Sequence, residues 1–414
     1  MKVLLLTCYF PPDTGSAAHL FYELGKALVQ RGHQVTVVTG MPGYHAAGPL
    51  ERYDGRLWLR EEMEGMRIAR VAAPRFADHS MIGRALWQFS GAVTSLCAGL
   101  VLPHHEIAVV YSPPLPLGLS GYMLHGLRGV PFILCVHDLF PQSIIDLGLL
   151  SNAAAIRGFE WLERLVYRKA VLITVPSEGN RQHVIHKGAA PAKVVALPDW
   201  ADTCFIQPGE RMNVFRQQHG LDDKFVVSFA GILGYSQDLD VVLGAASLLQ
   251  SYDNILFVIV GDGVEKPRLV ARAAEIGLQN VRFLAMQPRD KYPAVLHASD
   301  VGLATLHSSV RTPTVPSKIQ SIMAAARPVV AAMNLDGDAP RLIEKARCGY
   351  ALRPEDPQLL AETLLELYQN PGRCRECGQN GRRYVERHLS LEVCVQRYET
   401  LFMQVLGRGQ TTHA

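Results

Sequence analysis

The sequence predicts an α/β protein made of two doubly wound domains, and three observations support this prediction. Short apolar runs, typical of buried parallel strands, alternate with amphipathic segments of helical period as far as about residue 350. The alternation restarts after residues 199–212, a stretch with Pro208-Gly209 that is typical of a linker. A chain of 414 residues is also long for a single core, so two domains are expected.

Composition excludes some classes of protein. The chain has 41 Lys and Arg against 38 Asp and Glu, so no global charge indicates nucleic-acid binding. Its eight cysteines are scattered, which favours a reducing compartment over a disulfide scaffold. Cys374 and Cys377 form a single C-x-x-C without a second pair of ligands. We therefore expect two cysteines on a helix face and no zinc site.

The first βαβ unit begins with a strand at Lys2–Leu6, a turn and an amphipathic helix, followed by a strand at Val35–Thr39. Such units favour a parallel sheet whose loops gather at the carboxyl ends of the strands. Gly15 and Ser16, in the turn, would then face a ligand. A glycine turn is also simply how a strand meets a helix, and both interpretations stay open.

A continuous apolar run, Pro131–Val136, predicts a fully buried strand that ends in His137-Asp138. Ligand crevices form at such strand ends in open α/β sheets. His137 could donate to a sugar hydroxyl or meet a developing charge, or it could bond only to its own loop. Residues 44–74 look less regular than the rest of this half.

The second domain repeats the pattern, with glycine turns directly after its first two strands. The expected strands are Phe225–Ala230, Ile255–Val260, Val281–Leu284, Val301–Thr305 and Val329–Ala332. We assign residues 1–200 to the first domain and 213–385 to the second. A helix within residues 386–414 would pack back toward the first domain.

The stretch from Val310 to Met333 is predicted to form a loop, the start of a helix and a buried strand, in that order. Ser317 and Gln320 have the spacing of a capping box, and an apolar helical face follows. The free N–H groups of a first helical turn, with Lys318 there and Arg311 in the loop before, can bind an anion. We predict the diphosphate of a nucleotide sugar. The alternative is a capped surface helix with a solvated lysine.

Two D-x-D segments could hold a divalent ion, Asp238-Leu239-Asp240 and Asp336-Gly337-Asp338. The first lies at an expected helix start, where aspartate commonly caps, and the second lies in a turn. We expect no metal and no other cofactor.

Five segments in this order, PPDTG, HDLFP, GILGYSQDLDVVLGAA, VIVGDG and VPSKIQSIMAAARPVVA, resemble the retaining family 4 glycosyltransferases of GT-B fold. The resemblance covers nearly the whole chain and implies two Rossmann-like domains that face each other across a cleft. The last segment is similar to a bacterial branch that adds sugars, often N-acetylated amino sugars, to surface polysaccharides. A nucleotide-sugar epimerase and a non-catalytic sugar-nucleotide-binding protein are the alternatives.

The resemblance implies that His137 and Lys318 are catalytic, with His137 near the reacting carbon and Lys318 at the leaving phosphates. Gly231 and Gly261 would approach the nucleotide, and Gln287 would lie where backbone reads the base. The full donor-binding set is Gly15, Ser16, Gly231, Gln237, Gly261, Asp262, Gln287, Arg311, Ser317, Gln320 and Ser321.

The chain departs from the family pattern at two places. Ile232 and Gln237 stand where many members carry an Arg and a Lys, and Pro313 and Ser321 stand where many carry two glutamates. The second glutamate normally holds the ribose. Positive charge and a ribose contact must therefore come from other groups.

The implied partners are a UDP-type nucleotide sugar and a lipid-linked saccharide acceptor, with no nucleic acid. The N-terminal apolar run is too short for a signal peptide, so a cytoplasmic protein is expected. The lipid-linked acceptor that the resemblance implies would hold it at the inner membrane face. Residues 81–102 form the most apolar stretch, either a buried helix or a membrane contact. Basic residues within 152–193 would add attraction to anionic lipid.

Overall fold

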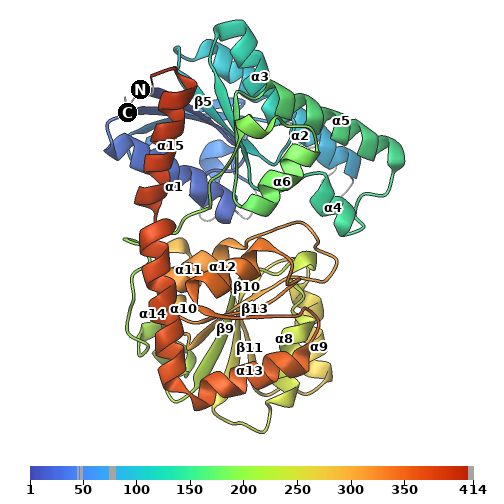
Figure 1. Cartoon of the computed structure of the whole chain (residues 1–414), viewed down its shortest axis with the longest axis vertical. Helices are drawn as coiled ribbons and strands as arrows, with labels where there is room; N and C mark the ends of the chain where they lie inside the picture. The colour runs from blue at the N-terminus through green and yellow to red at the C-terminus, as the bar shows by residue number, and fades with distance from the viewer. Residues whose placement is uncertain (44–45, 47–49, 74–80, 409–414) are drawn as a thin grey trace. The chain divides into compact units, whose positions relative to one another are not determined.

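The computed structural model describes residues 1–43, 46, 50–73 and 81–408, with backbone only at residues 81 and 82. The chain forms two compact units (Figure 1). Unit 1 contains Met1–Pro198 and Leu391–Ala414, and unit 2 contains Asp199–Ser390. The C-terminal segment therefore belongs to the same unit as the N-terminus.

Unit 1 is built on an eight-stranded sheet in the order β3-β4-β2-β1-β5-β6-β7-β8, parallel except for β3. Its strands are β1 (Lys2–Leu6), β2 (Gln34–Gly40), β3 (Trp58–Met63), β4 (Met66–Val71), β5 (Ile107–Ser112), β6 (Phe132–Val136), β7 (Leu172–Val175) and β8 (Val194–Ala196). The central strands β1, β5 and β6 form the apolar core, since β5 and β6 are buried at every position.

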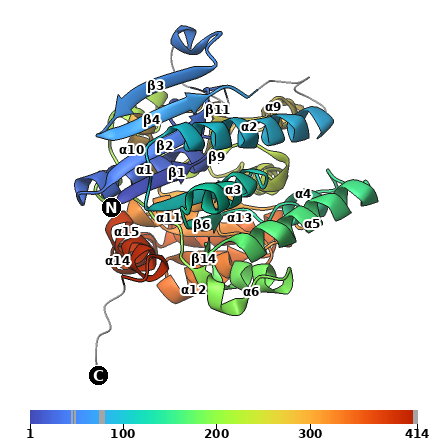
Figure 2. The ribbon, with the colours of Figure 1, turned by 90° about the horizontal axis from the view of Figure 1, so that it is seen from above.

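The helices of unit 1 are α1 (Ser16–Gln30), α2 (Met81–Val101), α3 (Leu117–Arg128), α4 (Gln142–Asp146), α5 (Ala153–Lys169), α6 (Glu178–His186) and α15 (Leu391–Val405), with short 3-10 turns at Glu51–Tyr53 and Pro191–Lys193. Helices α2, α3 and α5 form a row, whereas α15 lies beside α1 (Figure 2). Glu399 of α15 is bonded to Arg31 and His33, each at 2.8 Å, which ties the C-terminal helix to the first helix.

Unit 2 has a six-stranded, all-parallel sheet in the order β11-β10-β9-β12-β13-β14. Its strands are β9 (Phe225–Ile232), β10 (Ile255–Asp262), β11 (Val281–Leu284), β12 (Val301–Thr305), β13 (Val329–Ala332) and β14 (Gly349–Leu352). The doubly wound α/β fold predicted for both halves is confirmed, and β1, β11, β12 and β13 have the expected bounds.

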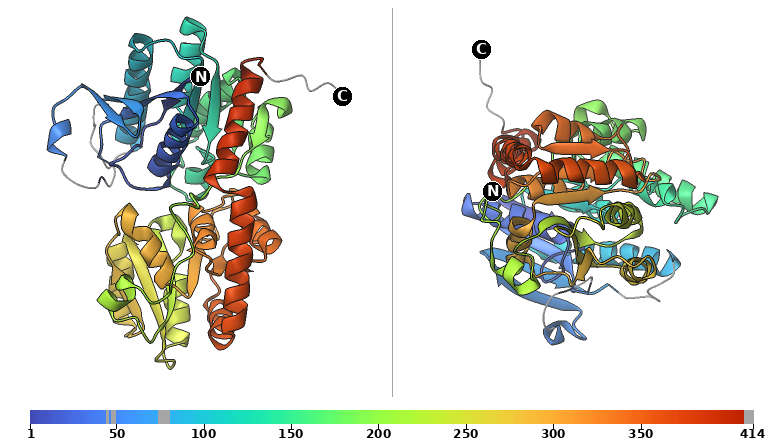
Figure 3. Two further views of the ribbon diagram at one scale, coloured as in Figure 1. Left: turned by 90° about the vertical axis from the view of Figure 1, so that its left-hand side faces the viewer. Right: turned by 90° about the horizontal axis from the view of Figure 1, so that it is seen from below.

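The helices of unit 2 are α7 (Val214–His219), α8 (Asp240–Leu248), α9 (Lys266–Glu275), α10 (Tyr292–Ala298), α11 (Ser317–Ala324), α12 (Asp338–Ala346), α13 (Pro357–Gln369) and α14 (Pro371–His388), with 3-10 turns at Tyr235–Gln237 and Arg289–Lys291. The long helix α14, orange-red in Figure 3, runs along the flank of the unit and packs against α11.

The expectation of an irregular region at residues 44–74 is wrong where the structure describes it. Strands β3 and β4 form an antiparallel hairpin there, turning at Glu64 and Gly65, which both have positive φ. Strand β3 lies at the sheet edge and carries the charged run Arg60 to Glu62, so its sequence lacks the apolar continuity of the buried strands. Residues 44–45, 47–49 and 74 lie outside the described residues.

Helix α2 accounts for most of the apolar stretch at residues 81–102, and its two faces differ. Ala92, Ser95 and Ala98 are buried, whereas the opposite face exposes Leu86, Phe89, Val93, Leu100 and Val101. These five lie at helical spacing along one side. Among the described helices, none is long and apolar enough to cross a membrane.

Candidate functional site

The glycines predicted to approach a nucleotide lie side by side at the carboxyl edge of the unit 2 sheet. Gly231 at the end of β9 is paired in register with Gly261 at the end of β10. A Cβ atom on Gly261 would lie 1.9 Å from the carbonyl oxygen of Gly231. The strands can therefore end this close together only with glycine at position 261. Its role is at least structural.

Lys318 lies against this glycine edge. Its Nζ is 3.7 Å from the centroid of the Phe229 ring, and its Cε would lie 3.6 Å from a Cβ on Gly231. Its ammonium donates a hydrogen bond to the side-chain carbonyl of Gln237. The ammonium therefore contacts the ring face of Phe229 in β9 and the neutral side-chain amide of Gln237, which follows β9.

Burial lowers the pKa of Lys318 to about 7. Within the described part of the chain, its ammonium makes no ion pair with a carboxylate. An anion that reached Lys318 would favour the charged form and raise this pKa again. The geometry is therefore that of a cation without a structural counterion.

The predicted capping box at the start of α11 is wrong. The N-cap is Pro316, and no side chain caps the helix. Ser317 becomes the first helical residue, from which its hydroxyl cannot serve as the N-cap acceptor. With its amide oriented to satisfy both neighbours, buried Gln320 donates to the carbonyls of Pro316 at 3.0 Å and Ser317 at 3.1 Å. The first-turn N–H groups beside Lys318 are consequently without a side-chain cap.

Of four other predicted donor-binding residues of unit 2, three have local contacts and one is exposed in a loop. Asp262 is exposed and accepts from the N–H of Gly263 at 2.8 Å, so it holds its own turn. Gln287 donates to the carbonyl of Ala285, and Ser321 donates to that of Ser317. Arg311 is exposed in the loop before α11. The described contacts bring Lys318 together with Gln237 and Gly231, but not with these four.

Sequence reasoning missed Lys266, a second cation at the same sheet edge. Its Nζ donates to the carbonyl of Gly261 at 2.8 Å and to that of Leu284 at 3.3 Å, which ties the ends of β10 and β11 together. A lysine three residues after the Gly261-Asp262-Gly263 turn was the available signal.

A cavity of about 210 Å³ lies beside this edge, at the starts of α8 and α9. Its lining comprises Gly234, Tyr235, Asp238, Leu239, Asp240, Glu265, Arg268, Leu269 and His307. Arg268 bonds both carboxylate oxygens of Asp240, at 3.1 and 2.6 Å, so this half of the first D-x-D segment is already paired. Among the described residues, no group of three His, Cys, Asp or Glu side chains is placed to bind a metal ion.

In unit 1, His137 directly follows β6 as predicted, and it belongs to a cluster. Its ring stacks on Tyr111 with centroids 4.9 Å apart, and its Nε2 lies 3.2 Å from the Cys135 sulfur. The same sulfur lies 3.1 Å from the Tyr398 hydroxyl of α15. Burial raises the pKa of the Cys135 thiol, but His137 and hydrogen bonds with Thr174 and Tyr398 outweigh this effect, and the net direction is downward. Sequence reasoning missed Cys135 and Tyr398.

Gly15 and Ser16 also lie in unit 1, at the start of α1. Gly15 is the N-cap with φ of 112°, a conformation that favours glycine, and no atom lies within 4 Å of a Cβ built on it. Ser16 is exposed. The unit's own packing therefore leaves space at this turn, and the glycine is required there by its backbone angle.

Two family models together match most of the chain. The description "Glycosyl transferase 4-like domain" matches residues 14–200, and "Glycosyl transferases group 1" matches residues 212–384. The putative colanic acid biosynthesis glycosyl transferase WcaI of Escherichia coli K12 is 25% identical over 409 residues, covering 96% of this chain and 98% of the relative. The probable glycosyltransferase WbjE of Pseudomonas aeruginosa is 26% identical over 297 residues, covering 71% and 74%.

Solved structures show the same fold. HepE of Anabaena, solved with UDP and glucose, superposes with a TM-score of 0.74 at 16% identity, covering 98% of this chain and all (100%) of that one. WaaG, a glycosyltransferase involved in lipopolysaccharide biosynthesis, has a TM-score of 0.70 at 16% identity, covering 97% and 99%. Two doubly wound units that match such proteins along their whole length define the GT-B class.

The chain belongs to the glycosyltransferase family that combines the 4-like and group 1 domains, and it is a glycosyltransferase. The family resemblance drawn from its motifs is confirmed. Retention of configuration, the amino sugar, and the assignment of individual donor-binding and catalytic residues stay predictions.

Proposed function

We propose that this enzyme transfers a sugar, for which an N-acetylated amino sugar is our candidate, from a UDP-type donor to a lipid-linked saccharide during surface polysaccharide synthesis, with retention and without a metal. The observation that carries this proposal is Lys318, a cation without a carboxylate partner in the described chain, beside the glycine edge of β9 and β10. The name of WcaI, which refers to colanic acid biosynthesis, and the UDP bound to HepE support the acceptor and donor classes.

In this proposal, the bond between the anomeric carbon and the diphosphate oxygen breaks, and its electron pair stays on the leaving diphosphate. The acceptor hydroxyl oxygen forms the new bond on the same face, and its proton passes to an oxygen of the leaving phosphate. Lys318 and the uncapped first turn of α11 stabilise the negative charge that grows there, as a metal ion does in other transferases. Such preoriented donors need no reorganisation during the reaction.

His137 would serve the sugar side of the reaction. Its stacking on Tyr111 and its contact with Cys135 fix the plane of the ring at the end of β6. A fixed imidazole can present one nitrogen to a sugar hydroxyl or to developing charge. This role would account for a half-buried histidine at the carboxyl end of a parallel strand, where ligands bind in open α/β sheets.

The exposed side of α2 supports attachment to a membrane surface. Leu86, Phe89 and Val93 lie on one face at helical spacing, where a contiguous apolar patch signals a binding surface. Helix α5, in the same row of helices, exposes Trp161, which is 60% accessible, together with the basic residues Arg157, Arg164, Arg168 and Lys169. Apolar insertion and attraction to anionic lipid would then act together.

The reaction is tested by incubating the purified enzyme with a panel of UDP-sugars, with and without a lipid-diphosphate saccharide, and analysing products by mass spectrometry. Transfer with retained configuration that needs the acceptor and survives excess EDTA supports the proposal. An epimer formed without acceptor would indicate an epimerase, and loss of activity restored by Mg²⁺ or Mn²⁺ would overturn metal independence.

Membrane attachment is tested separately by co-sedimentation with vesicles of phosphatidylcholine and phosphatidylglycerol. We expect binding that weakens in high salt and falls further in the triple variant Leu86→Ser, Phe89→Ser, Val93→Ser. The matched control replaces exposed apolar residues of unit 2, Val264→Ser, Val270→Ser and Leu335→Ser. Equal binding by both triple variants, or no binding at low salt, would contradict attachment through α2.

A further inference from the structure

A groove of about 420 Å³ in unit 2 is walled by arginines and lies apart from the nucleotide edge. Its polar lining is contributed by Arg327, Arg375, Gln379, Arg382 and Arg383, with Pro208 at its rim. Four of these residues come from α14 at positions i, i+4, i+7 and i+8, so they lie on one face of that helix. Lys318 and the glycine turns are not part of this lining.

The charges of the groove are poorly compensated. Elsewhere on α14, Arg373 pairs with Glu376 at 2.9 Å. In the groove, Arg382 pairs with Glu386, whereas Arg383 bonds the neutral Asn380 and pairs with no carboxylate of the described residues. Arg375 is exposed and has no ion pair within the described part of the chain. Four guanidinium groups therefore line the groove, with Glu386 paired to Arg382 and Asp300 acting on Arg327, and the net charge is still positive, which favours an anion.

The floor of the groove is rigid. Arg382 donates to the carbonyls of Ile206 at 2.7 Å and Ala324 at 2.8 Å, and also to that of Thr203. Arg327 donates through one terminal nitrogen to the carbonyls of Gly209 at 2.8 Å and His297 at 2.7 Å. Both guanidinium groups are thus fixed, and these bonds use most of the N–H donors of Arg382, so the two residues contribute mainly charge while the exposed Arg375 and Arg383 supply the donors for a ligand.

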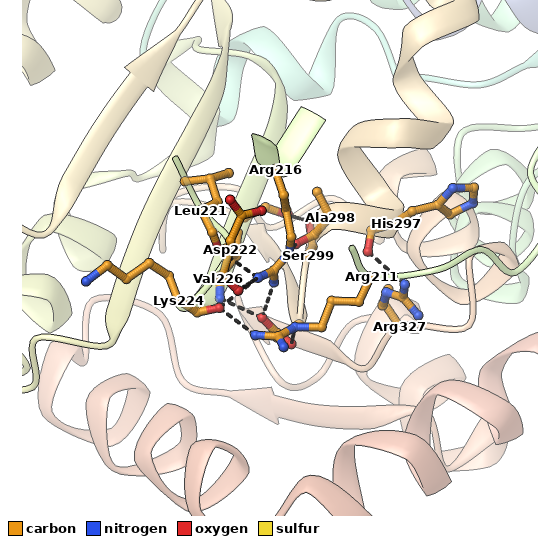
Figure 4. A network of polar contacts seen from close by, with 12 residues as sticks. Arg211, Arg216, Leu221, Asp222, Lys224, Val226, His297, Ala298, Ser299 and Arg327 are labelled. Atoms are coloured by element: carbon orange, nitrogen blue, oxygen red, sulfur yellow. Dashed lines mark hydrogen bonds and ion pairs between the residues drawn. The ribbon is translucent and has the colours of Figure 1, made fainter. Parts of the chain in front are cut away.

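A second layer of charged side chains lies behind Arg327. Arg211 and Arg216 both bond Asp300, each at 2.5 Å, so two arginines share one carboxylate (Figure 4). The pKa of Arg327 is lowered by burial, and the charges of Arg216 and Arg211 add to this effect against the opposing pull of Asp300. Its Nε is buried and has no hydrogen-bond partner among the residues that the structure describes. Asp222 also acts on Arg216, so this layer is close to charge balance and the surplus positive charge lies in the groove itself.

We propose that this groove is a second anion site, which binds a ligand carrying one or more phosphate groups. Arginine forks match phosphate oxygens in pairs, and each such charge-assisted bond is stronger than a neutral one. A volume of about 420 Å³ is in the range of small-molecule sites and has room for more than a single phosphate. A soluble diphosphate and a phospholipid headgroup share this chemistry.

The site is tested with inorganic pyrophosphate by titration calorimetry on the Lys318→Ala protein, in which the cation of the proposed donor site is absent. We expect binding that weakens roughly tenfold or more in the added double variant Arg375→Ala, Arg383→Ala, because it removes the two exposed guanidinium groups that would bond the phosphate oxygens. Both side chains are exposed, so folding should be unaffected.

The matched control is Arg272→Ala, Arg341→Ala, which removes the same charge from exposed positions on α9 and α12. It should bind pyrophosphate as the parent does. Equal loss in both double variants, or pyrophosphate binding no tighter than sulfate at equal ionic strength, would show general screening and overturn the site.

The source of the phosphate is distinguished by a competition. Vesicles of phosphatidylcholine with phosphatidic acid should displace pyrophosphate if the site takes a headgroup. Pure phosphatidylcholine vesicles should not. If neither displaces it, the site takes a soluble phosphate compound, and failure of pyrophosphate to bind at all would overturn the proposal.

Discussion

The two edges of the unit 2 sheet each hold a cation, fully buried at Arg216 and half-buried at Lys318, and the surroundings of the two cations differ. At the amino edge, Arg216 is fully buried, bonds Asp300 and donates to the carbonyls of Ala298 and Leu221 (Figure 4). At the carboxyl edge, Lys318 has an aromatic face and one neutral amide.

This difference distinguishes a structural cation from one available to a ligand. A buried charge is tolerated in a fold when its hydrogen-bonding capacity is satisfied and an opposite charge lies near it, as at Arg216. Lys318 is half-buried, and its ammonium pairs with no carboxylate of the described residues. Burial lowers its pKa to about 7. This difference is what we expect if Arg216 serves the fold and Lys318 serves an anionic ligand.

The largest expected effect concerns the structural edge. Arg216→Met should destabilise the protein by about 3–5 kcal/mol, because Asp300 and several carbonyl groups lose a buried partner. Arg211→Met is the matched control, since Arg211 bonds the same carboxylate at 2.5 Å but its side chain is 44% exposed. It should cost about 1 kcal/mol or less. Urea denaturation measures both, and equal losses would abolish the distinction drawn here.

At the other edge, Lys318→Ala should lower kcat/KM for sugar transfer by about 10²-fold or more, the usual loss for one transition-state donor, which is about 2.7 kcal/mol. The folded state should not lose comparable stability, because no carboxylate among the described residues is left unpaired. Steady-state kinetics with a melting curve on the same sample measures both. Near-normal turnover would show that Lys318 is only a buried lysine of the core.

Sequence alone was sufficient where the signal is local. Val301–Thr305 and Val329–Ala332 are continuous apolar runs, and the structure gives them the predicted bounds. Lys318 was selected because it lies in the first turn of a predicted helix. The β3 strand was missed because an edge strand carries charged residues, and Ser317 was misplaced because Pro316 takes the N-cap.

Contacts across long sequence separations were beyond such reasoning. Gln237 and Lys318 are 81 positions apart, and Cys135 and Tyr398 are 263 apart. Nothing in either local sequence indicates the partner, since pairing follows from how the sheet and α15 assemble. The residues of the candidate site were therefore partly predictable, whereas the absence of a counterion at Lys318 and its lowered pKa were not.

His137 extends the comparison to unit 1, with a smaller expected effect. His137→Ala should fold, because the half-buried ring contributes mainly its stacking on Tyr111, and such a pair is worth about 0.5–1.5 kcal/mol. Turnover should fall about tenfold or more, as expected for one lost hydrogen bond to a charged group. The control is His186→Ala, an exposed histidine of α6. Full turnover with a large loss of melting temperature would assign His137 to the core alone.

A slope of stability against pH tests the contrast at Lys318 directly. The folded-state pKa is about 7, below the ordinary 10.5 that applies when the chain is unfolded. Between these values the unfolded chain binds more protons than the folded one, so the free energy of unfolding should rise with pH. Below pH 7 both states are protonated, and the penalty from burying the charge is then present in full. Above pH 10.5 it is absent.

Subtracting the Lys318→Met protein, measured in parallel by urea denaturation, removes the titration of every other group. The difference between the two proteins should favour Lys318→Met most at pH 7 and shrink as the pH rises toward 10.5. Saturating UDP-glucose should flatten the wild-type slope. Its negatively charged diphosphate would favour the ammonium form of Lys318 and raise the pKa of that group, and the diphosphate itself loses no proton near neutral pH. A parallel pH profile for both proteins would mean that Lys318 titrates normally and has no need of a ligand's charge.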